Sequence, residues 1–204
     1  MRQRKAALII GGMALCVLMV GAAPKSEPAF GAYLGSSFSI GKEFIDMTSG
    51  GHTANHYQPG FVLGLYGQHD FSDDFGLQLS VAYQRFSNEW SFHYFDRHDE
   101  GKESLGGVSV SLNGAFMVAR SAMNEFYFLA GLGFLSSSFA NLGALFQVCG
   151  GIGGKFRLMP GSSTKVNLGA VLHHVMYSYG KARNAEYVRL QAGLEFRLRD
   201  RGQR

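Results

Sequence analysis

Hydrophobic and polar positions alternate with a period of two residues along much of the chain, most clearly in segment 60–86. The second half of this segment has Phe75, Leu77, Leu79, Val81 and Tyr83 on one side and Gly76, Gln78, Ser80, Ala82 and Gln84 on the other. This period is typical of a strand whose two faces meet different environments. Because the polar segment 71–74 divides the two halves, we expect a β-hairpin with a tight turn.

The same alternation recurs in six further segments, which gives eight expected strands. Besides the hairpin, these are 30–41, 105–118, 125–135, a segment ending near 158, a segment starting at 164, and 186–198. Long connections at 42–59, 87–104, 136–143 and 178–184 alternate with short turns at 71–74, 119–124 and 159–163. This order is that of strands running up and down between two different ends of one sheet.

The length and the chemistry of the strands favour a membrane location. A membrane-spanning strand needs about 9–11 residues, and only helices and closed barrels satisfy their backbone groups in lipid. We therefore predict an all-β fold, an eight-stranded antiparallel up-and-down transmembrane β-barrel. A soluble barrel of the lipocalin type is the alternative, but it would turn its apolar face inward and its charges outward. Here the charged strand residues lie on the small and polar face.

The first residues have the form of a secretory signal peptide. A basic start at 1–5 precedes the uncharged apolar run 6–20, and small residues follow at 21–22. We expect a signal peptide at 1–22 and a barrel domain at 23–204; a transmembrane anchor is the alternative. Loss of Arg2, Arg4 and Lys5 lowers the formal net charge from +4 to about +1, so the basic balance gives no argument for nucleic-acid binding. Cys149 then has no partner for an intramolecular disulfide.

The chain resembles the small eight-stranded outer-membrane β-barrel proteins of Gram-negative bacteria. The hairpin 60–86, the stretch 128–133 and the closing strand 188–198 carry the resemblance. It implies the cell outer membrane as the location, reached by signal-peptide export through the periplasm. It also implies short turns at the periplasmic end and long loops outside. The partners it implies are outer-leaflet lipopolysaccharide and the barrel-assembly machinery, which could read Phe196 near the end of the last strand.

Charged residues are expected inside the barrel, toward the periplasmic ends of the last four strands. They are Glu125, Lys155, Arg157, Lys165, Glu195 and Arg197. Since buried charges are retained when they are paired, we expect ion pairs of Glu125 with Arg157 and of Glu195 with Lys165. Such pairs would plug the lower mouth. A pore for small solutes is the alternative interpretation.

Enzyme chemistry has one candidate position, His174. The resemblance includes lipid A deacylases, in which a histidine and a serine stand two residues apart on one strand face. Here His174 and Ser178 are four apart, about 13 Å along an extended strand, which is too far for a nucleophile and its base. Glu186 could be a third partner. We predict no catalytic residues, and a lipid-modifying enzyme remains the alternative.

Cofactor and metal sites are not expected. His52, His56, His93 and His98 fall in the first two long loops. His52 and His56 could share a metal only on a helical turn, which the sequence does not favour. Trp90, Phe92 and Tyr94 alternate in the second loop and are candidates for surface contact or for prolonging a hairpin above the membrane. We therefore expect a non-enzymatic structural or adhesion-like role, in which loops 42–59 and 87–104 contact a surface protein or glycan.

Overall fold

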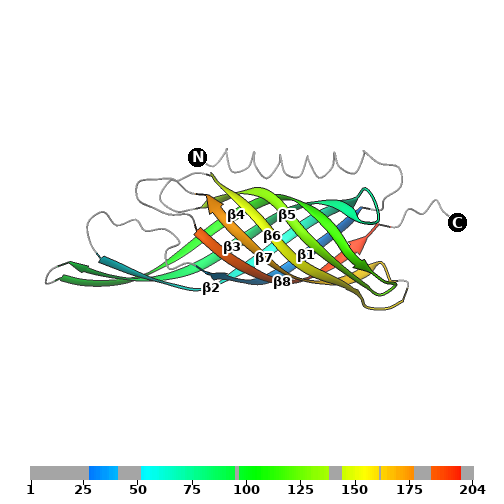
Figure 1. Cartoon of the computed structure of the whole chain (residues 1–204). Helices are drawn as coiled ribbons and strands as arrows, with labels where there is room; N and C mark the ends of the chain where they lie inside the picture. Colours follow the sequence, from blue (N-terminus) through cyan, green and yellow to red (C-terminus); the bar gives the residue numbers. More distant parts are fainter. Residues whose placement is uncertain are drawn as a thin grey trace, which may run out of the picture.

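The computed structural model describes residues 28–40, 52–94, 97–137, 144–160, 162–176 and 185–198. Its eight strands are β1 (Ala29–Ser39), β2 (His52–Asp70), β3 (Phe75–Tyr94), β4 (Arg97–Arg120), β5 (Asn124–Ser137), β6 (Ala144–Arg157), β7 (Thr164–Met176) and β8 (Ala185–Arg197). Each strand pairs antiparallel with the next, and β1 pairs with β8, so the sheet closes into a barrel (Figure 1). The predicted fold is confirmed. The expected signal peptide lies outside the described residues.

The register of the ladders fixes the tilt of the strands. A hydrogen-bonded row that starts at Glu125 runs through Lys155, Asn167 and Gly193 and returns to β5 at Leu135, ten residues further along. For eight strands, a stagger of ten residues corresponds to a tilt of about 41° and a backbone diameter of about 16 Å. A barrel of this width is filled by its own side chains. Two residues at the same height along the barrel axis are therefore diagonal neighbours on adjacent strands and are not directly opposite in the ladder.

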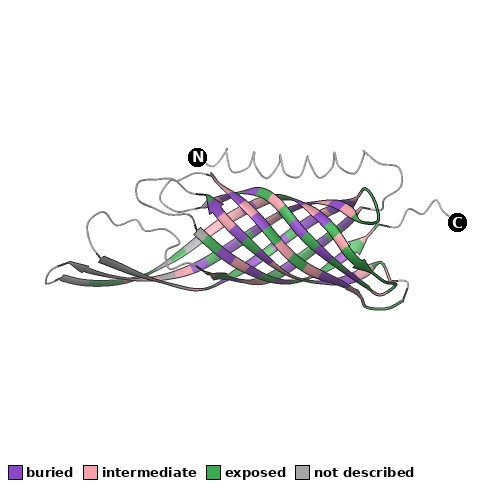
Figure 2. Ribbon diagram, viewed as in Figure 1, coloured by how far each residue is buried: buried purple, intermediate pink, exposed green. Residues whose placement is uncertain are grey.

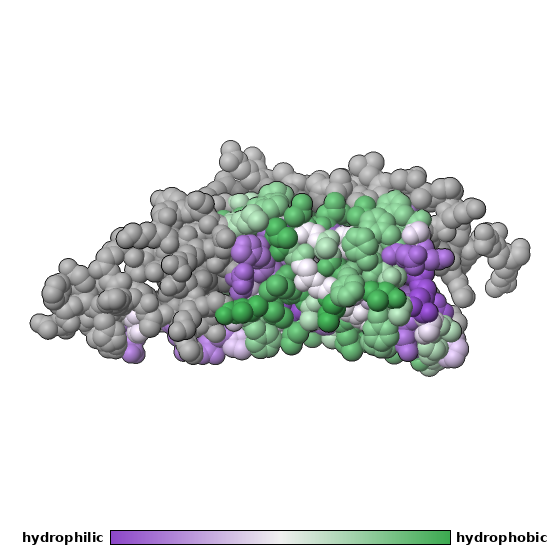
Figure 3. Space-filling view, viewed as in Figure 1, coloured by the Kyte–Doolittle hydropathy of each residue, from purple (hydrophilic) through white to green (hydrophobic). Residues whose placement is uncertain are grey.

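The barrel is apolar outside and polar inside. Its exposed large hydrophobic side chains include Leu34, Leu63, Phe128 and Ile152, whereas Gln78, Asn113, Asn167 and Glu195 are buried. Figure 2 shows buried and exposed positions alternating along the strands, and Figure 3 shows an apolar band between polar ends. This inversion relative to a soluble barrel is what lipid requires, because apolar side chains face the acyl chains and the closed ladder pairs the backbone. No helix in the described part of the chain is long and apolar enough to cross a membrane.

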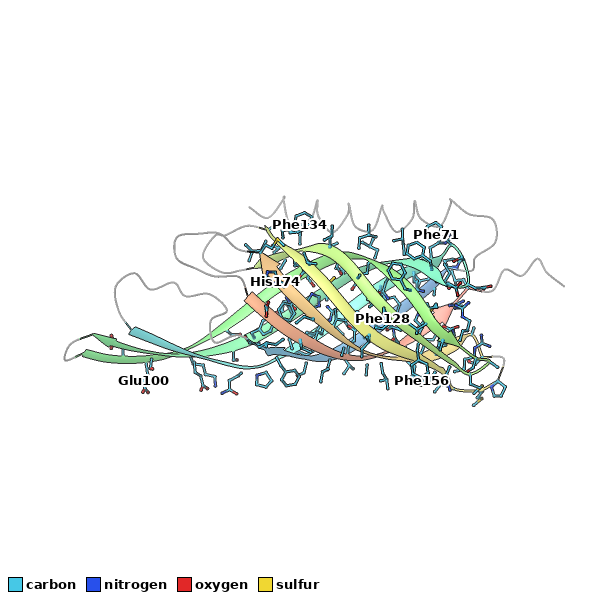
Figure 4. The ribbon with its side chains drawn as sticks, in the orientation of Figure 1. Phe71, Glu100, Phe128, Phe134, Phe156 and His174 are labelled. Carbon is cyan, nitrogen blue, oxygen red and sulfur yellow. The ribbon has the colours of Figure 1, made fainter. Side chains whose placement is uncertain are left out.

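Aromatic pairs mark both ends of the apolar band. We call the end with the short connections the turn end and the opposite end the loop end. Phe75–Phe116 and Phe126–Phe156 lie at the turn end, with ring centroids 5.1 and 5.9 Å apart, and Phe134–Phe146 lies at the loop end, 5.7 Å apart. Figure 4 shows Phe156 and Phe134 toward opposite ends of the barrel. Aromatic rings are favoured at the two membrane interfaces of such barrels.

The end of one expected loop, 52–59, and most of the other, 87–94 and 97–104, are strands, so this part of the sequence interpretation is wrong. Residues 42–51 lie outside the described residues. Beyond Gly60, which lies opposite Ser37, and Gly107, which lies opposite Ser137, strands β2, β3 and β4 continue without β1 and β5. They form a three-stranded sheet of residues 52–59, 87–94 and 97–106, which we call the projecting sheet (Figure 1). A bulge between Gln58 and Phe61 marks its base. Pro59 sits in this bulge, where a residue without an N–H does not break the ladder.

Candidate functional sites in the lumen and above the barrel

The turn end of the lumen is closed by ion pairs. Lys155 Nζ lies 2.5 Å from Glu195 Oε2, and Lys165 Nζ lies 2.7 Å from Glu125 Oε2. Arg197 Nη2 lies 2.9 Å from Asp70 Oδ2, and Arg120 Nε lies 3.2 Å from Glu125 Oε1. We call these side chains the turn-end cluster: Asp70, Arg120, Glu125, Lys155, Lys165, Glu195 and Arg197. Its two lysines are 1% exposed, so their charges depend on the carboxylates for compensation.

The predicted pairings within this cluster are wrong, although five of the six predicted residues belong to it. Glu125 pairs with Lys165 and not with Arg157, and Glu195 pairs with Lys155 and not with Lys165. Glu125 lies directly opposite Lys155 in the ladder, and Glu195 lies directly opposite Lys165. The ion pairs instead pass over one intervening strand, because the tilt brings diagonal neighbours to the same height. Arg157 makes no ion pair within the described residues.

The sequence interpretation missed two members of the cluster, for different reasons. Asp70 is two residues after the inward residue Gln68, so it lies on the same face of β2, and the alternation of β2 could have identified it. Arg120 could not be found this way, because a bulge between Met117 and Ala119 reverses the alternation at the end of β4. A bulge inserts one residue and turns the following side chains to the other face.

Hydrogen bonds join the cluster to the middle of the lumen. Tyr66 OH donates to Glu195 Oε2 at 3.0 Å, and Asn167 Nδ2 donates to Tyr66 OH at 2.9 Å. Tyr127 OH donates to Asn167 Oδ1 at 2.6 Å, and Lys155 Nζ donates to the side-chain oxygen of Gln68 at 2.8 Å. Hydrogen-bonded networks of this kind hold buried polar side chains in one arrangement. The turn half of the lumen is therefore a connected polar plug.

The loop half of the lumen is polar but less completely paired. Tyr187 stacks on His173 with ring centroids 4.6 Å apart, accepts a hydrogen bond from Gln84 Nε2 at 3.2 Å and donates one to Gln147 Oε1 at 3.3 Å. The guanidinium carbon of Arg189 lies 5.1 Å from the centroid of the Tyr33 ring. Cys149 is a buried free thiol whose Sγ lies 2.9 Å from Asn113 Oδ1.

His174 lies outside the lumen, on the lipid-facing side of β7 near the loop end (Figure 4). Its Nδ1 lies 2.8 Å from Glu186 Oε1 on β8, and both side chains are partly exposed. This carboxylate orients the imidazole, as in the histidine–carboxylate half of a hydrolase triad. Ser178, the serine considered with it, lies outside the described residues.

The projecting sheet carries exposed charge. Asp99, Glu100 and Lys102 on β4 are exposed, and Lys102 Nζ lies 2.7 Å from Glu89 Oε1 on β3. Figure 4 places Glu100 far from the barrel wall. The backbones of Trp90, Phe92 and Tyr94 lie in β3, so these residues do prolong the hairpin; their side chains lie outside the described part.

The four loop histidines also lie on this sheet, at backbone positions that the sequence interpretation did not foresee. His52 is directly opposite His93, and His93 is directly opposite His98. His56 is opposite Glu89. The sequence interpretation considered only His52 with His56, whereas the strand register brings His52, His93 and His98 into one row. Among the described side chains, no group of three or more metal-binding residues is present.

Comparison with known proteins gives matches at the level of structure alone. No protein-family model and no curated protein matches the chain. The outer membrane protein OprG from Pseudomonas aeruginosa is 13% identical with a TM-score of 0.56, and covers 86% of this chain and 98% of its own. Neisserial surface protein A is 12% identical with a TM-score of 0.54, and covers 86% and 100%. The chain has the fold of the small outer-membrane β-barrels. At this identity the similarity concerns the fold, and the chemistry must come from the residues described above.

Proposed function

We propose that this barrel works in the outer membrane as a non-enzymatic surface-contact protein. The short connections would face the periplasm and the projecting sheet would face outside, in contact with the lipopolysaccharide leaflet. The barrel-assembly machinery would insert it, and export would use the signal peptide at 1–22. The observation that carries the proposal is the projecting sheet: three strands continue beyond the barrel rim, where they have no role in closing the barrel.

The chemistry of this sheet suits contact with another macromolecule. Over the described residues, β3 is the only strand that pairs with the two outer strands of this sheet in the ladders, because β1 ends at Ser39 and β5 ends at Ser137. An outer strand of a sheet is a position at which an extended segment of a partner protein can add by strand pairing. Trp90, Phe92 and Tyr94 occupy alternate positions of β3, and aromatic residues are enriched in binding hot spots. A surface protein or a glycan is the proposed partner.

The test compares bacteria that display the wild-type barrel with bacteria that display the W90S/F92S/Y94S variant. Adherence is measured on protein-coated and on glycan-coated surfaces. Loss of three aromatic contacts should reduce adherence roughly tenfold or more on one of them. A V108S/V110S variant, altered on the barrel wall, is the control for general effects of substitution. Equal adherence of the triple variant on both surfaces, with a folded barrel by heat-modifiable gel migration, would contradict the contact role.

A second candidate function rests on the His174–Glu186 pair. A carboxylate-oriented imidazole at the lipid-facing rim is placed to act as a general base on an outer-leaflet lipid. Such an enzyme would hydrolyse an acyl ester of lipid A and release a fatty acid. Mass spectrometry detects the lost acyl chain as a lower mass of lipid A. If H174A cells and wild-type cells differ in lipid A acylation while adherence is unchanged, the enzyme is favoured over the contact protein. Identical lipid A profiles would remove this candidate.

A further inference from the structure

Arg189 is a buried cation without a carboxylate partner in the described part of the barrel. Its relative exposure is 3%, and the ion pairs of the lumen gather at the turn end. Its guanidinium packs on the Tyr33 ring, and its Nε has no hydrogen-bond partner. An uncompensated charge in a barrel wall surrounded by lipid is costly, and the usual remedy is an opposite charge nearby. Among the residues that the structure describes, no carboxylate of the loop half of the lumen has this role.

Three further side chains around Arg189 have polar atoms without hydrogen-bond partners. Ser37, directly opposite Arg189 in the β1–β8 ladder, has an unpartnered Oγ. His173 is two residues from Val171, which is opposite Arg189 on the other side, and neither of its ring nitrogens has a partner. Gln147 Nε2 is also unpartnered, and Gln147 is opposite Val175, two residues beyond His173. All three residues are completely buried.

These groups share one chemical property, because each can donate a hydrogen bond. Arg189 Nε–H, the His173 ring N–H, the Ser37 hydroxyl and the Gln147 amide come from β8, β7, β1 and β6, which are consecutive neighbours in the barrel. Donors around a buried positive charge are the arrangement that binds an anion. Gly133, Ser111 and Ala82 on β5, β4 and β3 are small, while Gln84 of β3 reaches across the lumen to the Tyr187 hydroxyl beside these donors.

We propose that Arg189, His173, Ser37 and Gln147 form a lumen site for a small monovalent inorganic anion of halide size. Because the barrel is about 16 Å wide between backbones and its lumen is lined by tyrosines and glutamines, we expect this site to take a small ion and not a large solute. The turn-end cluster closes the opposite mouth, so the anion enters from the loop end. Its charge compensates Arg189, and its binding stabilises the folded barrel in proportion to its concentration.

Water is the competing occupant. The side-chain oxygens of Gln84 and Gln191 are also buried and unpartnered, and they are acceptors that water can satisfy. A lumen filled by water alone satisfies the polar groups but leaves the charge of Arg189 uncompensated. The two possibilities differ in one measurable respect, since only the first makes stability depend on the identity of the anion.

The experiment measures the thermal unfolding midpoint of the full barrel in detergent, in sodium bromide and in sodium gluconate at equal ionic strength. The wild type should unfold at a higher temperature in bromide, and the difference should saturate as bromide rises. R189M should lose this difference, and K102M, altered at an exposed lysine on the projecting sheet, should keep it. An equal bromide effect in R189M, or no bromide effect in the wild type, overturns the proposal.

A second measurement covers the case in which R189M does not fold. The wild-type barrel with ¹⁵N-labelled arginine gives one Nε–Hε resonance for each arginine, and the Arg189 signal should shift on bromide titration with a saturating curve. Anomalous scattering from bromide-soaked crystals should place a peak beside Arg189. Bromide found only at exposed arginines, with an unmoved Arg189 resonance, would show that the lumen holds water alone.

Discussion

At the scale of single residues, tyrosine rings and glycines interlock on the inner wall. Tyr33 and Gly64 are directly opposite, and so are Gly31 and Tyr66. A Cβ on Gly64 would come 2.3 Å from the Tyr33 ring, and a Cβ on Gly31 would come 2.3 Å from the Tyr66 ring. Each ring therefore lies flat over a position that has no side chain. The narrow barrel gains room for large polar residues in this way.

Substitution of Gly64 tests this packing. G64A should lower the free energy of unfolding by about 1–3 kcal/mol, because the Tyr33 ring must leave its rotamer and its hydrogen bond with Ser80 at 2.9 Å. The measurement is urea-induced unfolding in lipid vesicles. G150A is the matched control: the nearest atom to its Cβ is 3.8 Å away, so its stability should match the wild type within about 0.5 kcal/mol. Equal effects of the two substitutions would contradict the interlock.

Removal of one partner of a buried ion pair gives a second prediction. E195Q leaves the Lys155 charge buried without a carboxylate, and the cost should be about 3–5 kcal/mol of unfolding free energy. The double variant K155M/E195Q removes both charges and should recover most of that loss. Urea unfolding of the two variants and the wild type measures both values. A double variant no more stable than E195Q would mean that the ion pair is not the interaction responsible.

At the scale of elements, the projecting sheet should be separable from the barrel. Replacing residues 88–103 by a short Asn-Gly turn removes the tips of β3 and β4 but leaves the ladder of Ser87 and Ser104 intact. The barrel should still fold, because its aromatic bands and lumen network lie below the cut. Heat-modifiable gel migration shows whether the shortened barrel folds. The control deletion, of residues 108–111 within the wall of β4, should abolish folding, since it shifts the remaining register.

The row of histidines offers a test of the register of the projecting sheet. Residues directly opposite on antiparallel strands have Cβ atoms about 4.5–5.5 Å apart, close enough to share a metal ion. His93 is opposite both His52 and His98, so the full barrel should bind Zn²⁺, and H93A should weaken binding by roughly tenfold or more. Isothermal titration calorimetry measures the zinc affinity, and H56N is the control variant. A slip of one residue would place the histidines on opposite faces and leave no zinc binding.

The sequence predicts where the strands lie better than it predicts which side chains meet in the lumen or where each strand ends. The alternation of β3 shows that Ser80 and Gln84 share a face, and eight such segments are enough to predict the barrel. It does not show that Glu125 meets Lys165, because that contact depends on the stagger of the closed sheet. It also does not show where β3 ends: polar residues such as Asn88 and Glu89 indicate a loop, yet the antiparallel ladder continues to Tyr94 and Arg97.

At the scale of the whole molecule, the two faces of the sheet meet two environments: lipid lies outside, and polar side chains fill the lumen. Lipid-facing side chains such as Leu65 and Leu132 need no mutual packing, since lipid tails contact them directly. Specific contacts therefore concentrate in the lumen, where polar groups have few alternatives to one another. The consequence is a barrel whose location follows from its outer surface and whose individual properties follow from its inner one.

The turn-end cluster makes a prediction about conduction by the intact barrel. In planar bilayers the wild type should show no stable ion current, because paired, nearly unexposed side chains from β5, β6, β7 and β8 fill the turn end. E125A/K165A shortens two of them and should admit water and small ions, whereas E125Q/K165M removes the charges at nearly the same volume and should stay closed. If charge rather than bulk closed the lumen, E125Q/K165M would conduct as well. A current through the wild type comparable to that of E125A/K165A would show that the cluster does not close the barrel. It would favour the alternative interpretation, a pore for small solutes.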